Sequence, residues 1–167
     1  MALSHSLLPE YDHEMAVTRR VLEQVPFAEA GWKPHPRAMS VGQLATHLAD
    51  IPSWTRAILE RDMYDMAAGR PGPPEITHRD AAGLLASFDR RVASARASIE
   101  QTGDAQLAEE WRLASGPDVV ARMTKLAALR RYVLGHLVHH RGQMSVYLRL
   151  LGVAVPAICG PSADERA

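Results

Sequence analysis

Apolar side chains recur at intervals of three and four residues in four separate parts of the chain. These stripes occupy residues 8–25, 41–59, 85–99 and 126–151. Pro26, Gly103 and Gly152 follow three of them and end the pattern. Because this spacing places the apolar side chains on one face of an α-helix, it predicts four amphipathic helices of roughly 20 residues each.

Polar residues mark where two of these helices begin. Ser40 and Gln43 have the spacing of a capping box, in which both side chains satisfy free amides at a helix start. Thr77 and Asp80 take the corresponding places before the third stripe. Pro52 lies inside the second stripe, where its missing amide hydrogen predicts a kink.

The segments between and after the stripes read as non-helical. Residues 69–74 are rich in proline and glycine and predict a long connection between helices two and three. Residues 103–121 show no helical period, so we expect a loop over one end of the helices, with a turn at 115–118 and with Trp111 plugging the core or lining a pocket. Residues 153–161 predict an apolar, non-helical tail that packs on the helices or on a partner subunit.

Four such helices predict an all-α protein built as a four-helix bundle. Alanine and leucine are abundant, whereas aromatic residues make up 5% of the chain, which favours helix over sheet. A chain of 167 residues suffices for one domain with a substantial core, so residues 1–167 are expected to form a single domain.

The charge balance and the single cysteine limit the classes of function. Lysine plus arginine and aspartate plus glutamate number 19 each, which argues against a nucleic-acid partner. No apolar run approaches the length of a membrane span, and residues 1–9 lack the features of a signal peptide. The lone Cys159 excludes an internal disulfide and fits a reducing compartment. We therefore expect a soluble, cytoplasmic protein.

The fourth stripe contains three histidines within five residues, at positions 136, 139 and 140. With about 100° between successive helical residues, His140 falls near the middle of the apolar face and His136 roughly 40° to one side. His139 points toward the flank. Side chains four residues apart lie one helical turn apart, so the imidazoles of His136 and His140 can converge on one metal ion. Alternatively, each could be a core histidine that bonds a neighbour.

A third ligand is available on the second helix. His47 lies at the edge of that stripe, one turn before Pro52, and a kink there would re-aim it toward the interior. Three neutral imidazoles leave a coordination position for water or substrate, which is typical of catalytic zinc sites. A divalent ion there could activate water or stabilise a thiolate, and because imidazole suits zinc, nickel, copper and iron alike, the residues do not select the metal. Gln143, one turn beyond His140, could hydrogen-bond a ligand imidazole or the metal-bound water and so orient it.

Several segments closely resemble the DinB/YfiT-like family. They are Ser-Val-Gly-Gln-Leu-Ala-Thr-His at 40–47, Trp54, His-Leu-Val-His-His-Arg-Gly-Gln at 136–143, Tyr-Leu-Arg-Leu-Leu-Gly at 147–152 and Pro-Ser-Ala-Asp-Glu at 161–165. The resemblance implies a four-helix bundle with up-down-down-up connectivity, a long linker between helices two and three, and often a homodimer. This sequence departs from the family pattern at Cys159, where an aromatic residue is frequent in the family.

The resemblance also implies a divalent metal, commonly nickel or zinc, on His47, His136 and His140. Relatives in the wider superfamily look like thiol-dependent transferases or isomerases and metal-dependent hydrolases, which act with glutathione-like, mycothiol or bacillithiol cosubstrates. We therefore expect a metal-dependent enzyme of the hydrolase or thiol-transferase type that acts on a small-molecule substrate.

Two alternatives stay open. One is a non-catalytic protein that binds metal or a small molecule in a stress response, because no convincing general acid or base accompanies the histidines. Asp12, Glu14 and Asp50 are the nearest candidates for that role. The other alternative has no metal, and the histidines are then polar core residues of a dimerising helix bundle.

Overall fold

A computed structural model describes residues 3–68 and 74–165 of the chain. Its α-helices are α1 (Leu3–Glu23), α2 (Val41–Asp50), α3 (Trp54–Glu60), α4 (Ala81–Gln101), α5 (Asp104–Ala108), α6 (Lys125–Leu129) and α7 (His136–Leu150). Short 3-10 turns are η1 (Phe27–Glu29), η2 (Ile51–Ser53), η3 (Met66–Ala68) and η5 (Ala163–Glu165), and η4 (Arg130–Gly135) is a π-helical stretch. The predicted connection at 69–74 lies almost wholly outside the described residues.

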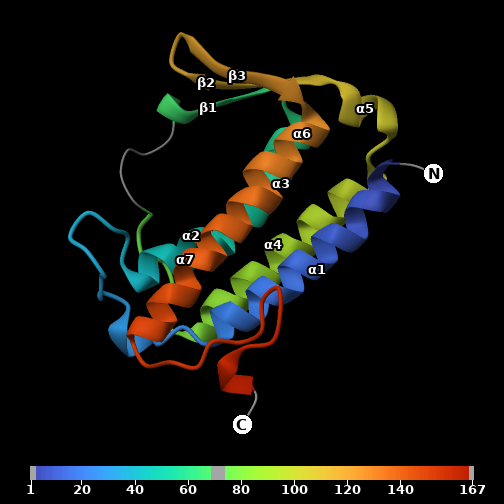
Figure 1. The fold of residues 1–167 in the computed structure, drawn as a ribbon. Helices are drawn as coiled ribbons and strands as arrows, with labels where there is room; N and C mark the ends of the chain where they lie inside the picture. Colours follow the sequence, from blue (N-terminus) through green and yellow to red (C-terminus); the bar gives the residue numbers. More distant parts are fainter. Residues whose placement is uncertain (1–2, 69–73, 166–167) are drawn as a thin grey trace.

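The predicted all-α class is wrong, because a three-stranded sheet covers one end of the helices (Figure 1). Its strands are β1 (Met63–Asp65), β2 (Glu110–Ser115) and β3 (Asp118–Thr124). The strand β1 pairs with β2 in parallel, and β2 pairs with β3 as an antiparallel hairpin. The protein is therefore a mixed structure and not a pure four-helix bundle.

The hairpin lies where we expected an irregular loop. Trp111 and Leu113 alternate with polar residues, and this period of two turns both side chains toward the helices. The predicted turn is present between the strands, and Gly116 has a φ of 59°, a conformation that two-residue hairpin turns require. Trp111 is fully buried in the core and thereby joins the hairpin to the helices.

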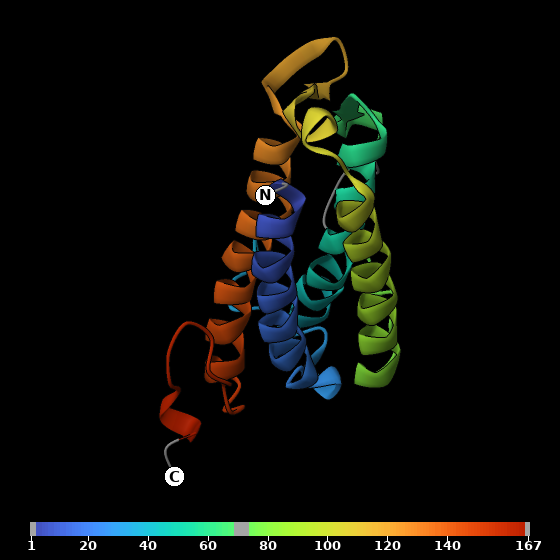
Figure 2. The same ribbon diagram turned by 90° about the vertical axis from the view of Figure 1, so that its right-hand side faces the viewer.

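The long helices form two pairs side by side. The helix α1 packs along α4, and α2 packs against α7 (Figures 1 and 2). In Figure 1, α1 and α7 run from the sheet end toward the opposite end, whereas α2, α3 and α4 run toward the sheet. This arrangement places the histidines of α2 and α7 on neighbouring helices.

Pro52 interrupts the second helical segment more strongly than a kink would. The helix α2 ends at Asp50, η2 follows, and α3 begins at Trp54. Because proline has no amide hydrogen to donate, the regular bonding pattern cannot pass through this point. The break changes the course of the chain just after His47.

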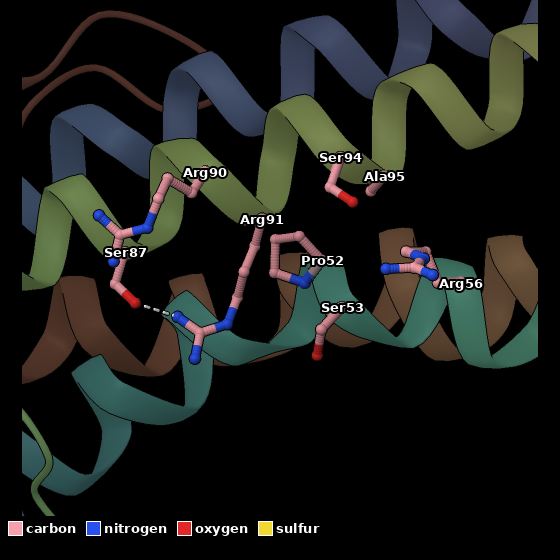
Figure 3. Close-up of a pocket in the computed structure, with 8 residues that line it drawn as sticks. All are labelled: Pro52, Ser53, Arg56, Ser87, Arg90, Arg91, Ser94 and Ala95. Carbon is pink, nitrogen blue, oxygen red and sulfur yellow. Dashed lines mark hydrogen bonds between the residues drawn. The ribbon is translucent and has the colours of Figure 1, made fainter.

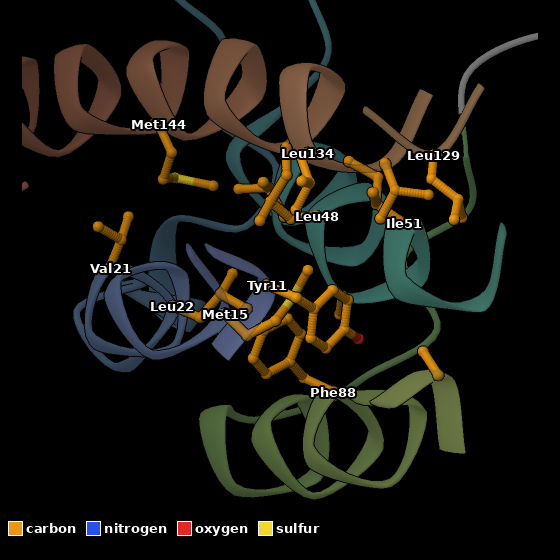
Figure 4. Close-up of a cluster of buried hydrophobic side chains, with 14 of the residues drawn as sticks. Tyr11, Met15, Val21, Leu22, Leu48, Ile51, Phe88, Leu129, Leu134 and Met144 are labelled. Atoms are coloured by element: carbon orange, nitrogen blue, oxygen red, sulfur yellow. The ribbon is translucent and has the colours of Figure 1, made fainter. Parts of the chain in front are cut away.

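The core lies between the helices and contains side chains from every long helical segment. Figure 4 shows Tyr11 and Met15 of α1, Leu48 of α2, Phe88 of α4 and Met144 of α7 directed toward one another. Each of these is at most 2% exposed. Burial of this apolar face stabilises the helices against one another.

A buried ion pair also joins α7 to α1. Arg141, which is 2% exposed, approaches the carboxylate of Glu14 to 2.6 Å and donates hydrogen bonds to the Glu14 carbonyl and the Thr18 hydroxyl. Because Arg141 directly follows His140, this clamp holds the histidine-bearing turn of α7 in a defined rotation.

The C-terminal tail packs back on its own chain. Val155 is 8% exposed, and its amide donates to Asp164, which also pairs with Arg149 of α7. Arg20 of α1 donates to the carbonyl of Ala157. Within the described ranges, no helix is long and apolar enough to span a membrane.

Candidate metal centre

The start of α2 is held by the capping box that the sequence predicts. The Ser40 hydroxyl accepts from the Gln43 amide at 3.2 Å, and the Gln43 side chain accepts from the Ser40 amide at 2.8 Å. A further contact ties this region to α7, because the Tyr147 hydroxyl donates to the carbonyl of Met39 at 3.2 Å. Together these bonds set the position of α2, and hence of His47, relative to α7.

The histidines of α7 follow the π-helical stretch η4. His136 is the first residue of α7, and His140 lies one turn later. A π turn contains an extra residue and often occurs at functional sites. At its end, a side chain on Gly135 would meet the Arg130 carbonyl oxygen at 3.1 Å, so the close approach of the backbone favours glycine there.

The three imidazoles converge on one point between α2 and α7. The Nε2 atom of His136 lies 3.2 Å from that of His47 and 2.8 Å from that of His140. The ring centroids are 4.6 to 4.9 Å apart, and the candidate ligand atoms all lie within 4.8 Å of one another. His140 is buried, and the other two are half-buried.

Gln143 determines which nitrogen of His140 has the lone pair. Its Oε1 lies 2.7 Å from His140 Nδ1. An amide oxygen can only accept, so Nδ1 donates its hydrogen and Nε2 presents a lone pair toward the other histidines. This is the arrangement in which a second residue orients a metal-binding imidazole. By contrast, Nδ1 of His136 has no regular hydrogen-bond partner, although it faces the backbone of Tyr132.

Burial keeps these imidazoles neutral. Burial, and then the charges of His140 and His136, lower the pKa of His47 to about 4. Burial and the charge of His140 likewise lower the pKa of His136 to about 4, against the opposing effect of the Tyr132 backbone. Burial also lowers the pKa of His140. Neutral imidazole is the form that binds metals, so the site is in its binding form at neutral pH.

The donor set fits a divalent transition metal. Zinc binds histidine nitrogens at about 2.0–2.1 Å in a tetrahedron, whose ligand atoms are then roughly 3.3 Å apart. The separations of 2.8 and 3.2 Å between the Nε2 atoms are close to that value. Lone pairs at such distances repel one another unless a proton or a cation lies between them. Three histidines placed this closely could therefore hold a metal ion.

An apolar pocket of about 410 Å³ opens beside the histidines. Its walls include His136 and His139 of α7, Trp54 of α3 and Tyr132 of η4, while Arg131 is exposed at its side. The Trp54 ring lies 5.9 Å from that of His136. A small molecule in this pocket would therefore lie next to the three-histidine cluster.

The model of the DinB family matches residues 3–167. The chain belongs to the DinB family. Two solved structures are similar to it over most of their length. They are a DinB-like protein from Bacillus cereus ATCC 10987, with a TM-score of 0.71 over 94% of this chain and 97% of that chain, and the DinB-like protein YjoA from Bacillus subtilis, with a TM-score of 0.66 over 88% and 92%. Each is 18% identical to this chain, so the likeness concerns the fold.

A shorter likeness exists to YrdA, an uncharacterised protein of Bacillus subtilis (strain 168). It is 45% identical over 38 residues, which are 23% of this chain and 23% of YrdA. The match therefore spans less than a quarter of that relative.

In this DinB-family chain the three acidic residues considered as acids or bases are engaged elsewhere. Asp12 pairs with Arg96 at 3.0 Å, and Glu14 pairs with the buried Arg141. Asp50 pairs with Arg91 at 2.9 Å. None of them joins the cluster of ligand atoms, so the histidines and Gln143 make up its polar groups among the residues described.

The remaining histidines and the cysteine lie apart from the cluster's ligand set. His139 is exposed on the flank of α7, although its ring is 4.8 Å from that of His140. His35 is exposed, and His78 is half-buried. Cys159 is an exposed free thiol.

Sequence reasoning missed most of the pocket. Leu113 comes from the segment 103–121, which we expected to be a loop, and Met66 comes from a segment for which the pattern predicted no element. Tyr64 stacks on Trp54 with the ring centroids 4.9 Å apart. The one available signal was Trp54, which lies two residues beyond Pro52, the site of the predicted kink. The other walls depend on the sheet, because strand β2 lies next to η4, where the rings of Trp111 and Tyr132 are 5.5 Å apart.

Proposed function

We propose that this DinB-family protein is a metal-dependent enzyme whose divalent ion, zinc or nickel, is bound by His47, His136 and His140. The convergence of three neutral Nε2 atoms beside an apolar pocket supports this proposal. A bound ion of this kind lowers the pKa of a water or a thiol and polarises a carbonyl group. The reaction class is hydrolysis or thiol transfer, with water or a low-molecular-weight thiol as the cosubstrate.

Different residues would orient the metal ligands and bind the substrate. Gln143 holds His140 in the tautomer that presents Nε2. Trp54 and Tyr132 offer aromatic surfaces to an apolar part of the substrate. Arg131 stands where it can pair with an anionic end of that molecule. We infer a small substrate with an apolar body, and its size is bounded by the pocket.

Metal analysis of protein purified without a histidine tag tests the first part of the proposal. We expect close to one equivalent of a transition metal, or its uptake on titration, and loss of binding in His140→Ala. The matched control is His139→Ala, which removes the adjacent exposed histidine. Less than about a tenth of an equivalent, with no uptake, would contradict the proposed site.

Catalysis is tested separately on the metal-loaded protein. It is screened with hydrolysable esters and amides, and with electrophiles together with each common cellular thiol. Turnover that disappears in His140→Ala and persists in His13→Ala, which removes an exposed histidine of α1 that does not line the pocket, supports the enzyme. Metal binding without turnover across the screen supports a second candidate.

That second candidate is a protein that binds a metal or a small molecule without turnover. It is favoured by the engagement of Asp12, Glu14 and Asp50 with arginines, and by a ligand cluster that contains no carboxylate among the residues the structure describes. Tight binding of a pocket ligand that the protein returns unchanged would favour this candidate over the enzyme.

We also propose a homodimer in the reducing environment of the cytoplasm. The outer face of α7 exposes Val138, Val146 and Leu150 at 41%, 55% and 60%. Residues at this spacing share one helix face, which offers an apolar surface to a second copy. Light scattering should give twice the chain mass for the wild type and a monomer for Val146→Glu. A monomeric wild type would contradict the dimer.

A further inference from the structure

A second cavity, of about 330 Å³, lies on the other side of the α2–α3 segment, against α4 (Figure 3). The histidine cluster lies between α2 and α7, so the two sites face different neighbouring helices. The break at Pro52 shapes this groove, since buried Pro52 and buried Ala95 of α4 both line it. We call it the arginine groove.

The lining of the arginine groove is basic and rich in hydroxyl groups. Arg56 of α3 and Arg90 and Arg91 of α4 contribute three guanidinium groups, and three serines contribute hydroxyls. No acidic side chain is among its lining residues. Ser87 is itself 7% exposed, so one of these hydroxyls belongs to a buried side chain.

The three guanidinium groups differ in how firmly they are held. Arg91 pairs with Asp50 at 2.9 Å and donates to the Ser87 hydroxyl, so it is fixed across the gap between α4 and α2 (Figure 3). Arg90 forms no ion pair within the part of the chain that the structure describes, and it keeps its full charge for a ligand.

Arg56 is held only by a weak ion pair. It pairs with Glu60 one turn further along α3, and both side chains are more than half exposed. Exposed pairs of this kind contribute little to stability. Arg56 can therefore exchange its partner at small cost. With two carboxylates beside three guanidinium groups, the surroundings of the groove retain one positive charge.

We propose that the arginine groove binds the phosphate group of a small phosphate monoester. Guanidinium forks donate paired hydrogen bonds to phosphate oxygens. The hydroxyls of Ser87 and Ser94 can donate to the remaining ones, whereas the Ser53 hydroxyl already donates to the Asp50 carbonyl at 2.6 Å. A phosphate monoester has close to two negative charges and three terminal oxygens, so it can engage more than one arginine at once. A carboxylate, by contrast, pairs both of its oxygens with a single guanidinium group. The remaining volume admits a small organic group beside the phosphate.

The test is calorimetric titration of the full chain with phenyl phosphate, with phenol as the ligand that lacks the phosphate. We expect saturable binding of one phenyl phosphate and none of phenol. Arg90→Gln should raise the Kd about tenfold, because a charge-assisted bond is lost. Ser94→Asp, which places a negative charge in the groove, should abolish binding. The exposed Arg122 of β3 supplies the control, since Arg122→Gln should leave the Kd unchanged within about twofold.

Three results would overturn the proposal. One is the absence of saturable phenyl phosphate binding to the wild type. Another is an unchanged Kd in both Arg90→Gln and Ser94→Asp, with both variants folded as judged by circular dichroism. The third is loss of binding in His140→Ala but not in Arg90→Gln, which would place the phosphate at the histidines.

Discussion

Replacing Gln143 should weaken metal binding without removing any of the three proposed ligands. In Gln143→Leu, His140 Nδ1 loses the acceptor at 2.7 Å. The neutral imidazole can then place its hydrogen on either nitrogen, and the tautomer with hydrogen on Nε2 cannot bind the metal through that atom. The ring also loses the bond that fixes its rotation.

The size of the effect follows from the type of bond that is lost. A neutral hydrogen bond contributes about 0.5–1.5 kcal/mol net, and loss of a residue that orients a metal-binding histidine typically costs about 10–100-fold in affinity. We therefore expect the metal Kd of Gln143→Leu to rise by about tenfold or more. The fold should be retained, because Gln143 is exposed and is not part of the core.

A competition titration with a chromogenic chelator measures this change directly. Gln143→Glu is the matched control, since a carboxylate at the same place accepts the Nδ1 hydrogen and should keep or raise the affinity. The reasoning would be refuted if wild-type protein bound metal and Gln143→Leu bound it equally well. It would also be refuted if Gln143→Glu were as weak as Gln143→Leu.

Three further predictions concern stability. The pKa of His47 and of His136 is about 4 in the folded chain, against 6.5 ordinarily, so the unfolded chain binds more protons between these values. The free energy of unfolding of metal-free protein should therefore rise as the pH increases from about 4 to 6.5, and the rise should be complete above about 6.5. Urea denaturation at both ends of this window measures the rise, which should be smaller for His47→Gln than for the wild type. Arg141→Met leaves the carboxylate partner of a buried pair without its counter-charge and should cost about 3 kcal/mol in the same assay, whereas Arg122→Met, in an exposed pair, should cost less than about 1 kcal/mol. Equal losses of unfolding free energy in Arg141→Met and Arg122→Met would contradict the role assigned to burial. Trp111→Ala should cost about 3–5 kcal/mol and lower the thermal midpoint, because it empties a fully buried site that joins the hairpin to the helices; a loss below about 1 kcal/mol would show that the hairpin is not part of the core.

The helices and the histidine geometry were accessible from the sequence because they depend on local periods. Side chains three and four residues apart must share a helix face, so the apolar stripes indicated the long helices, and the spacing of His136 and His140 placed both imidazoles inward. The capping box at Ser40 is likewise a local pattern, and the structure contains it. His47 was proposed as a third ligand from its place at the edge of the second stripe before Pro52, and the resemblance to the DinB/YfiT-like family pointed to the same residue.

The sheet could not be predicted in the same way, and the all-α class was wrong for that reason. Strand β1 is short, and its pairing partner β2 is distant in the sequence, with Met63 opposite Arg112. The alternation of Trp111 and Leu113 was present but brief, and it was interpreted as an irregular loop. Pairing between remote strands is decided by which backbone groups meet when the helices pack, and no local spacing encodes it.

The sequence alone determined where the helices form, that two histidines of α7 share the inward face, and which family pattern the chain resembles. Tertiary structure decided that the three Nε2 atoms meet, that Gln143 selects the tautomer of His140, and that the candidate acids are bound to arginines. It also created the apolar pocket and the arginine groove, whose walls come from segments far apart in the chain. The physical reason is the range of the forces: backbone hydrogen bonds repeat within one helical turn, whereas a site requires contacts that only the packing of whole helices and strands creates.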